Sequence, residues 1–242
     1  MYLESFNLDD MKKTIYFFFI TTLMLSACNN SQDQKAGNNE LEEDSVIADK
    51  PDSVIMDENL AIINSTGFSK YAKTSIPELN WNKFTITKFW QEDFPNKTSF
   101  ETDKTFLDAY GQFLKYSPDS SKFIDLDSYN ISITKNKKGQ LIGGSQEPDT
   151  EISLVDLKKK EKMRLVFLGP GNSVEDAAWI DNDNLVLIGY LENEAASGTN
   201  AAIWQFNLSS KRVNLYELSD EEVIKKLKNY SERERLKNVR IK

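Results

Sequence analysis

The sequence predicts a mainly β protein made of two antiparallel, blade-like meanders that do not close into a propeller. One helix is expected before them and one at the C-terminus. Short apolar, β-branched runs alternate with polar turns from residue 117 to residue 218, which is typical of antiparallel strands. Before and after this region, apolar residues recur at spacings of three and four, which is typical of helices. Residues 61–242 are therefore expected to form a single β-rich domain.

Nine strands are expected between the turns. The turn at 117–121 contains Pro118, which presets φ, and Asp119, whose side chain can hydrogen-bond the local backbone. A second polar turn lies at 181–184, with the sequence Asp-Asn-Asp-Asn. The first series of strands is expected at 122–127, 131–134, 140–143, 151–157 and 163–168, and the second at 174–180, 185–190, 201–208 and 212–218.

The two series resemble each other at an offset of 51 residues, since residues 155–160 (VDLKKK) match residues 206–211 (FNLSSK). Their openings, 117–120 (SPDS) and 178–182 (AWIDN), resemble the aromatic-Ser-Pro-Asp-Gly openings of TolB-like and WD40-type propeller blades, although neither has the glycine. The resemblance covers residues 116–218 and implies blade-like sheets. Only two repeats are visible, and a closed propeller takes at least four blades. We therefore expect meanders that are packed on each other or capped by helices, and not a ring. An unrelated antiparallel sheet with the same turn chemistry is the alternative.

Helices are expected on both sides of the meanders. In 102–115, the residues Phe106, Tyr110 and Phe113 share one helical face, which favours a core helix over a ligand platform. Residues 219–222 (SDEE) form a capping box that starts a C-terminal helix. The late basic residues of this helix complement its dipole, and contact with anionic lipid or a partner is the alternative. Residues 81–87 are expected to form a strand.

The N-terminal region resembles a bacterial lipoprotein signal. Lys12 and Lys13 precede an apolar run at 14–25, and Leu25-Ser26-Ala27-Cys28 matches the lipobox. The run is shorter than the roughly 20 residues that span a bilayer. The resemblance implies cleavage before Cys28 and acylation of its thiol and amine, with palmitate among the acyl chains. Residues 1–28 then contain the signal peptide, and we expect translation to start at Met11. The mature protein is expected to be anchored in a membrane of the cell envelope, namely the outer membrane.

Residues 29–60 are expected to be a disordered acidic tether. They contain nine acidic and two basic residues, no aromatic residue and little apolar content, so they cannot bury enough surface to order. Residues 61–242 contain 26 acidic and 26 basic residues and are neutral. The acidic charge of the tether argues against nucleic acid and against anionic membrane surfaces as its partners.

The composition narrows the possible chemistry. The chain has no histidine, and its one cysteine is Cys28, so imidazole-based triads and zinc sites are excluded. The carboxylate pairs Asp125/Asp127 and Glu175/Asp176 lie beside apolar runs, but we interpret each pair as a strand end or a solvated face. Asp181 and Glu192 have the spacing of a calcium loop, but a strand occupies the remaining loop positions. We therefore expect no enzyme, no catalytic residue, no cofactor and no metal.

Two functions remain as hypotheses. The first is a non-enzymatic interaction or scaffold module that binds another envelope protein. The second is a lipoprotein that binds a glycan or other small ligand on exposed aromatic side chains, for which the candidates are Trp179, Tyr190, Trp204 and Tyr216. Alternating aromatic residues in strands are more often core, so the exposure of Trp179 and Trp204 distinguishes the two hypotheses.

Overall fold

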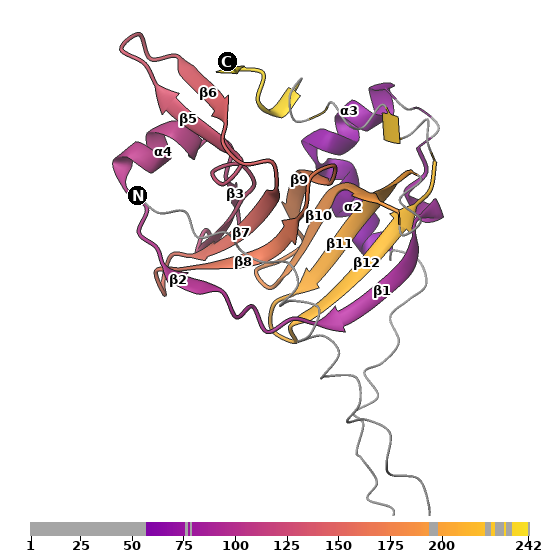
Figure 1. Ribbon diagram of the computed structural model, residues 1–242. Helices are drawn as coiled ribbons and strands as arrows, with labels where there is room; N and C mark the ends of the chain where they lie inside the picture. Colours follow the sequence, from indigo (N-terminus) through magenta and orange to yellow (C-terminus); the bar gives the residue numbers. More distant parts are fainter. Residues whose placement is uncertain are drawn as a thin grey trace, which may run out of the picture. The chain divides into compact units, whose positions relative to one another are not determined.

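A computed structural model of the chain describes residues 57–75, 77, 79–193, 198–220, 224–225, 230 and 234–241. In this part of the chain the fold is mainly β, with three separate sheets that do not close into a barrel or propeller (Figure 1). The fold class predicted from the sequence is therefore confirmed. The helices are α2 (Asp57–Ser65), α3 (Gly67–Ser75) and α4 (Lys104–Tyr110), and a 3-10 turn, η1, covers Trp81–Lys83.

Two of the sheets are four-stranded antiparallel meanders, each extended by one strand from the N-terminal side of the chain. Meander 1 has the order β3-β4-β7-β8, and β2 pairs with β8. Meander 2 has the order β9-β10-β11-β12, and β1 pairs with β12. The strands of meander 1 are β2 (Lys97–Ser99), β3 (Lys115–Tyr116), β4 (Lys122–Asp125), β7 (Thr150–Asp156) and β8 (Glu161–Leu168). Those of meander 2 are β1 (Thr85–Gln91), β9 (Ser173–Trp179), β10 (Asn184–Glu192), β11 (Thr199–Asn207) and β12 (Arg212–Leu218).

A third, smaller sheet is inserted into meander 1 between β4 and β7. It consists of the hairpin β5 (Ile131–Lys135) and β6 (Leu141–Ser145), and β13 (Val239–Ile241) near the C-terminus pairs with β6 in parallel. In Figure 1 this hairpin projects away from the two meanders. Meander 2 has no insertion at the equivalent place, since β10 is followed directly by β11.

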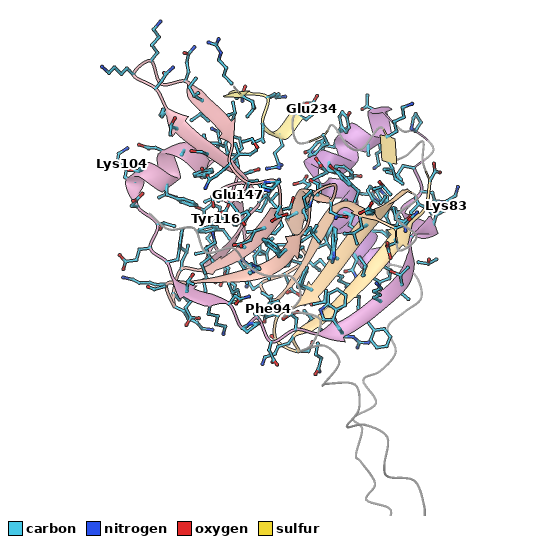
Figure 2. All side chains as sticks on the ribbon, in the orientation of Figure 1. Lys83, Phe94, Lys104, Tyr116, Glu147 and Glu234 are labelled. Carbon is cyan, nitrogen blue, oxygen red and sulfur yellow. The ribbon has the colours of Figure 1, made fainter. Side chains whose placement is uncertain are left out.

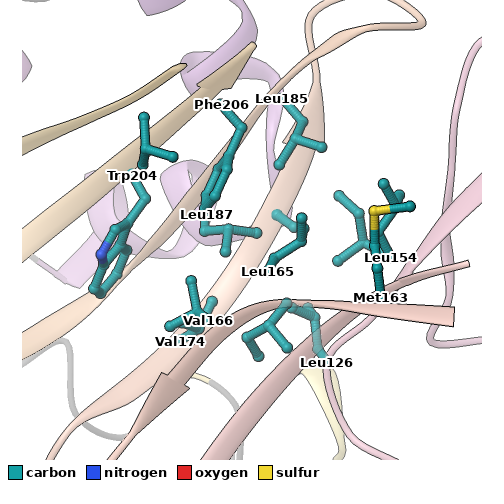
Figure 3. Packing of buried hydrophobic residues seen from close by; sticks show 14 of the residues in the cluster. Leu126, Leu154, Met163, Leu165, Val166, Val174, Leu185, Leu187, Trp204 and Phe206 are labelled. Carbon is teal, nitrogen blue, oxygen red and sulfur yellow. The ribbon is translucent and has the colours of Figure 1, made fainter. Parts of the chain in front are cut away.

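The two meanders share one hydrophobic core. Leu154 and Met163 of meander 1 lie in a single buried cluster with Leu187, Trp204 and Phe206 of meander 2 (Figure 3). Burial of one large apolar side chain contributes roughly 1.5–3 kcal/mol. The cluster is therefore the main source of stability between the sheets.

Helices cover the outer faces of this pair. Ile63 of α2 and Phe68 of α3 belong to a second cluster with Ile203 of meander 2. On the other side, Phe106 of α4 lies over Phe123 of meander 1, with 6.3 Å between ring centroids. Each meander therefore has one face against its neighbour and one face at least partly under a helix.

The meanders stack in the same orientation, because, of two residues 51 positions apart, one lies in the shared core and the other in a cluster on an outer face. Ile152 of meander 1 is in the shared core, but Ile203 is in the cluster beneath α2 and α3. Val155 is in the cluster beneath α4, but Phe206 is in the shared core. Stacking of this kind is typical of consecutive repeats in an array.

The strands were predicted closely, but the N-terminal elements were not. The strand expected at 81–87 is wrong in its first half, because the Asn80 side chain accepts a hydrogen bond from the amide of Asn82 at 2.9 Å and caps the turn η1. Helices α2 and α3 and the short strands β2, β3 and β13 were not expected. Helix α2 begins at Asp57 and buries Leu60, so the last residues assigned to the tether belong to the folded domain.

Several predictions lie outside the described residues. These are the signal peptide, Cys28 and the tether up to residue 56. In the expected C-terminal helix, residues 224, 225 and 230 are helical, and the rest of 221–233 is not described. None of the helices within the described ranges has the length and apolarity needed to cross a bilayer.

Candidate functional site

The turns of both meanders meet at one end of the stack and surround a cleft of about 490 Å³, which we call the turn cleft. Its floor is apolar, with Phe94 (labelled in Figure 2), Leu154 and Met163, all of them buried. Five lysines and four aspartates surround this floor: Lys97, Lys122, Lys158, Lys159, Lys211, Asp93, Asp119, Asp156 and Asp183.

Asp119 organises the turn between β3 and β4. Its Oδ1 accepts hydrogen bonds from the Ser121 amide at 3.0 Å and from the hydroxyls of Ser117 and Ser121 at 2.8 Å each. These bonds favour the charged form, so they hold the pKa of Asp119 far below its usual value. The turn predicted from Pro118 and Asp119 thus presents a fixed negative charge at the cleft.

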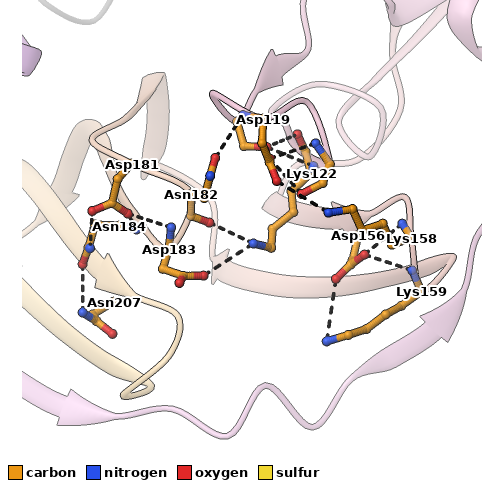
Figure 4. Close-up of polar contacts among 12 residues, drawn as sticks. Asp119, Lys122, Asp156, Lys158, Lys159, Asp181, Asn182, Asp183, Asn184 and Asn207 are labelled. Carbon is orange, nitrogen blue, oxygen red and sulfur yellow. Dashed lines mark hydrogen bonds and ion pairs between the residues drawn. The ribbon is translucent and has the colours of Figure 1, made fainter.

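This turn is joined directly to the turn between β9 and β10 (Figure 4). The Asp119 amide donates to Asn182 Oδ1 at 3.0 Å. Lys122 Nζ donates to the Asn182 carbonyl at 2.8 Å and lies 3.5 Å from Asp183 Oδ1. The cleft is therefore formed by contacts between the two meanders and not by either one alone.

The turn between β7 and β8 adds the next group of charges. Asp156 Oδ1 accepts hydrogen bonds from the amides of Lys158 and Lys159 at 3.0 and 2.9 Å. Lys158 Nζ lies 3.7 Å from Asp119 Oδ2, and Lys159 Nζ lies 3.7 Å from Asp156 Oδ2 (Figure 4). Both lysine side chains are largely exposed, so these long ion pairs are weak.

Lys160 and Lys211 occupy equivalent positions in the two meanders. Both have left-handed backbone angles, with φ of 55° and 58°. The carbonyl of Lys160 accepts from the Phe100 amide and that of Lys211 from the Glu92 amide, each at 2.8 Å. Lys160 also pairs with Glu101 at 2.6 Å and Lys211 with Asp93 at 2.8 Å. The hydrogen bond from Lys211 lowers the pKa of Asp93.

The turn cleft therefore combines an apolar floor with exposed, weakly paired charges of both signs. Such groups can exchange one ion pair for another when a charged surface approaches. Loops held by a rigid scaffold are also where binding residues concentrate. The arrangement is suited to recognition of a partner that has both charged and apolar groups.

The four aromatic residues predicted as a ligand surface do not lie together. Trp204 and Tyr216 are each only 3% exposed, and they face opposite sides of the same sheet, in the shared core and beneath α2 and α3 respectively. Trp179 is half-buried, and its Nε1 donates to the Lys115 carbonyl at 2.8 Å. Tyr190 is half-buried on β10. The prediction of a common exposed surface is corrected, because packing buries Trp204 and Tyr216 on opposite faces of the sheet and leaves Trp179 and Tyr190 half-buried.

The structure does bring the two carboxylate pairs together, at the end of the meanders away from the turn cleft. Asp125, Asp127, Glu175 and Asp176 are at most 3% exposed. Arg235 pairs with Asp127, and its Nε donates to the Glu175 carbonyl at 3.0 Å. All four carboxyl groups are therefore buried.

The four carboxyl groups and Arg235 belong to a buried polar network that also includes the partners of Asp176. Asp176 Oδ1 pairs with Lys115 Nζ at 2.7 Å, and its Oδ2 accepts from the Phe68 amide at 3.0 Å and from the Tyr230 hydroxyl at 3.4 Å. Burial raises the pKa of Asp127 and that of Tyr230. The network links α3, both meanders and the C-terminal segment, which is a structural role.

The calcium-like spacing of Asp181 and Glu192 has a structural explanation. Asp181 Oδ1 accepts from the amides of Asp183 and Asn184, and its Oδ2 from the Asn184 side chain, each at 2.7 Å. Asn184 and Glu192 are the first and last residues of β10, so the two carboxylates lie at opposite ends of that strand. In the described part of the chain, no three acidic or thiol side chains cluster as a metal would require.

Several residues of the turn cleft were not identified from the sequence. The turns containing Asp119, Lys158 and Lys211 were recognised individually. Asp93 lies in the crossing between β1 and β2, and Lys97 is the first residue of β2, where the sequence has no periodic pattern. The matching of residues 155–160 with 206–211 was the one signal that two of the turns lie at the same end of their sheets.

Comparisons with known proteins assign no family. No family model matches the chain, and no curated protein matches it. Among solved structures, the chain is similar to a protein from Clostridium novyi NT that is provisionally described as a conserved lipoprotein. The sequence identity is 14%, the match covers 56% of this chain and 70% of that chain, and the TM-score is 0.23. A score this low supports no argument, so the lipobox and the propeller resemblance stay predictions.

Proposed function

We propose that this chain is a lipid-anchored protein of the bacterial cell envelope whose β-rich domain is a non-enzymatic interaction module. The signal-like segment that ends at Cys28 supports the anchor. In this proposal the acyl chains on Cys28 hold the protein in the outer membrane, and the folded domain binds another envelope protein through the turn cleft.

The observation on which the interaction role rests is the construction of the turn cleft. Turns from both meanders converge there, and contacts such as the one between Lys122 and the Asn182 carbonyl fix their relative positions. The rigid framework lowers the entropy cost of binding. The exposed ends of Lys158, Lys159 and Lys211 remain accessible to a partner's carboxylates.

The anchor is tested by the Cys28→Ser variant. Two acyl chains give stable membrane attachment, so we expect the wild-type protein in the outer-membrane fraction of a density gradient and the variant in the soluble fraction. The folded domain should be unaffected, because the change lies outside it. Retention of the variant in the membrane pellet would rule out the lipoprotein assignment.

The interaction role is tested by crosslinking in intact cells. A photoreactive residue is placed at Ser209, which lines the turn cleft, and in a control chain at Thr74, which is exposed on α3. We expect a discrete adduct from position 209 alone. The charge reversal Lys211→Glu should reduce this adduct at least about tenfold, whereas Lys104→Glu on α4 should not. Equal adducts from both positions, or insensitivity to Lys211→Glu, would contradict the proposal.

A further inference from the structure

The inserted third sheet has a charge distribution unlike the rest of the domain. Residues 128–146 and 236–241 contain no acidic residue, although residues 61–242 as a whole are neutral. Four exposed cations lie on this sheet, namely Lys135, Lys137, Lys138 and Arg240. We call the sheet with these four residues the basic sheet.

The tip of the hairpin holds its lysines in a defined place. Asn136 Oδ1 accepts hydrogen bonds from the amides of Lys138 and Gln140 at 2.9 and 3.0 Å, and Gly139 supplies the positive φ of 79° that the turn requires. Figure 2 shows long side chains extending outward from this tip. The hydrogen-bonded turn thus holds these positive charges at the tip of the projecting hairpin.

The cations of the basic sheet differ in their ion-pair partners from the lysines of the turn between β7 and β8. In the turn between β7 and β8, Lys158, Lys159 and Lys160 each lie within 4.0 Å of a carboxylate. Within the described ranges, no carboxylate lies within 4.0 Å of the side-chain nitrogens of the four cations of the basic sheet.

Two acidic groups near the basic sheet, Asp108 and Glu234, are paired with other lysines. On α4, the hydrogen bond from Lys104, with a smaller contribution from the charge of Lys135, lowers the pKa of Asp108. Glu234 pairs with Lys237 at 3.4 Å. Among the described residues, the four cations of the basic sheet therefore have no ion-pair partner.

We infer that the basic sheet binds the anionic lipid headgroups of the membrane in which Cys28 is anchored. The inference rests on the proposed anchor for its location. Between Cys28 and Asp57 the chain spans at most about 100 Å, so the domain is confined near the surface at a high effective concentration. A weak contact of a few lysines is sufficient under these conditions, because a lipid anchor and a basic patch act together.

A second feature of the basic sheet favours a lipid surface over a purely polar partner. Ile241 is 49% exposed and lies next to Arg240 on β13. An apolar side chain beside a cation can enter the headgroup region while the cation contacts phosphate. The acidic tether has the opposite charge and would not compete for the same lipids.

The experiment uses the mature chain, residues 28–242, with Cys28→Ser, so that the acyl chains do not obscure the contact. Cosedimentation is measured with vesicles of phosphatidylglycerol and phosphatidylcholine and with vesicles of phosphatidylcholine alone. We expect binding to the anionic vesicles only, weakening as salt is raised. Combining Lys135→Gln, Lys137→Gln and Lys138→Gln should weaken it by about 100-fold.

The matched control combines Lys158→Gln, Lys159→Gln and Lys160→Gln, which removes the same charge from the paired turn and should change binding less than about threefold. Ile241→Ser should weaken binding without changing its salt dependence. Thermal unfolding checks that every variant is folded.

Three results would overturn the inference: equal weakening by the two triple variants, equal binding to neutral vesicles, or tighter binding to duplex DNA than to anionic vesicles. None of them bears on the anchor, which the fractionation of Cys28→Ser tests separately.

Discussion

Meander 1 and meander 2 have the same strand order but different side chains on equivalent faces. Pairing of Lys122 with Asp156, and of Asn184 with Asn207, sets the correspondence between their second and third strands. Trp204 and Leu215, on the face of meander 2 that packs against meander 1, correspond to Ser153 and Arg164. The face of meander 2 packs against another sheet and has apolar side chains. The corresponding face of meander 1 is covered only in part by α4, and it has polar side chains at these two positions.

The corresponding face of meander 1 uses polar contacts where meander 2 uses apolar packing, and it reaches solvent at Arg164 of β8, whose side chain is 37% exposed. Arg164 pairs with Glu151 at 2.6 Å, and the Ser153 hydroxyl donates to Glu151 Oε1 at 3.0 Å. Arg164 also lies 4.5 Å from the centre of the exposed Phe167 ring. The two sheets have the same topology, but the Trp204 face of meander 2 is fully buried and the Arg164 face of meander 1 is not. The two faces can therefore contribute different amounts to the free energy of unfolding.

The largest expected effect is that of Gly189→Ala in meander 2. A Cβ at Gly189 would lie 2.0 Å from the Ser173 carbonyl oxygen, at the bulge between β9 and β10. We expect a loss of more than about 5 kcal/mol, seen as failure to fold. The control Gly144→Ala, in the insertion of meander 1, has no atom within 4 Å of the new Cβ and should cost less than about 0.5 kcal/mol. A folded Gly189→Ala protein would contradict the close approach of these strands.

Substitution of the equivalent pair Trp204 and Ser153 tests the comparison directly. Trp204→Ala should reduce the free energy of unfolding by about 4 kcal/mol, because it leaves a cavity in the shared core. Ser153→Ala should cost about 1 kcal/mol, the value of one hydrogen bond. Urea unfolding measures both. Similar losses at the two positions would mean that the faces are not used differently.

Arg235→Ala removes the side chain that joins the two meanders at the end away from the turn cleft. We expect a loss of about 3 kcal/mol, since the buried carboxylate of Asp127 is left without its cation. Burial already raises the pKa of Asp127. The protonated carboxyl of Asp127 therefore contributes to stability at low pH, and this contribution is lost as the pH rises through the raised pKa.

The cost of Arg235→Ala should accordingly grow with pH, which unfolding at about pH 4 and about pH 8 would show. The double variant with Asp127→Asn is the control, and its cost should depend less on pH. A cost independent of pH in Arg235→Ala alone would contradict the role of Asp127.

The smallest expected effect concerns Lys160 and Lys211, where the two meanders are most alike. Glycine at either position removes the strain of a left-handed backbone but also loses an exposed ion pair. We expect each variant to change stability by less than about 1 kcal/mol, and both in the same direction. Changes of opposite sign, measured by thermal unfolding, would show that the two turns are not equivalent.

The strands could be predicted because their signal is local. In β7, β8, β10, β11 and β12, β-branched and apolar residues mark each strand, and polar turns mark its ends. The short strands β2 and β13 have three residues each and exist only because a partner strand pairs with them. No pattern within three residues can reveal such pairing.

The helices at 57–75 were missed for a different reason. Acidic residues at 57 and 58 continue the composition of the tether, so the apolar spacing of Leu60 and Ile63 was not recognised as a helical face. The turn cleft was partly predictable, because Asp119 and Lys158 belong to recognised turns. Its assembly depends on contacts between residues about 60 positions apart, such as Lys122 with Asn182, and composition does not contain them.

The helices that cover the outer faces also limit how this architecture can change in evolution. An array of stacked repeats grows by duplication when each new repeat finds an open face on the last. Here α2 and α3 occupy one terminal face, and α4 occupies part of the other. A duplicated meander would have to displace a helix before it could join the stack. A gene duplication that added only strands would therefore gain no place to pack, and the array stays at two units.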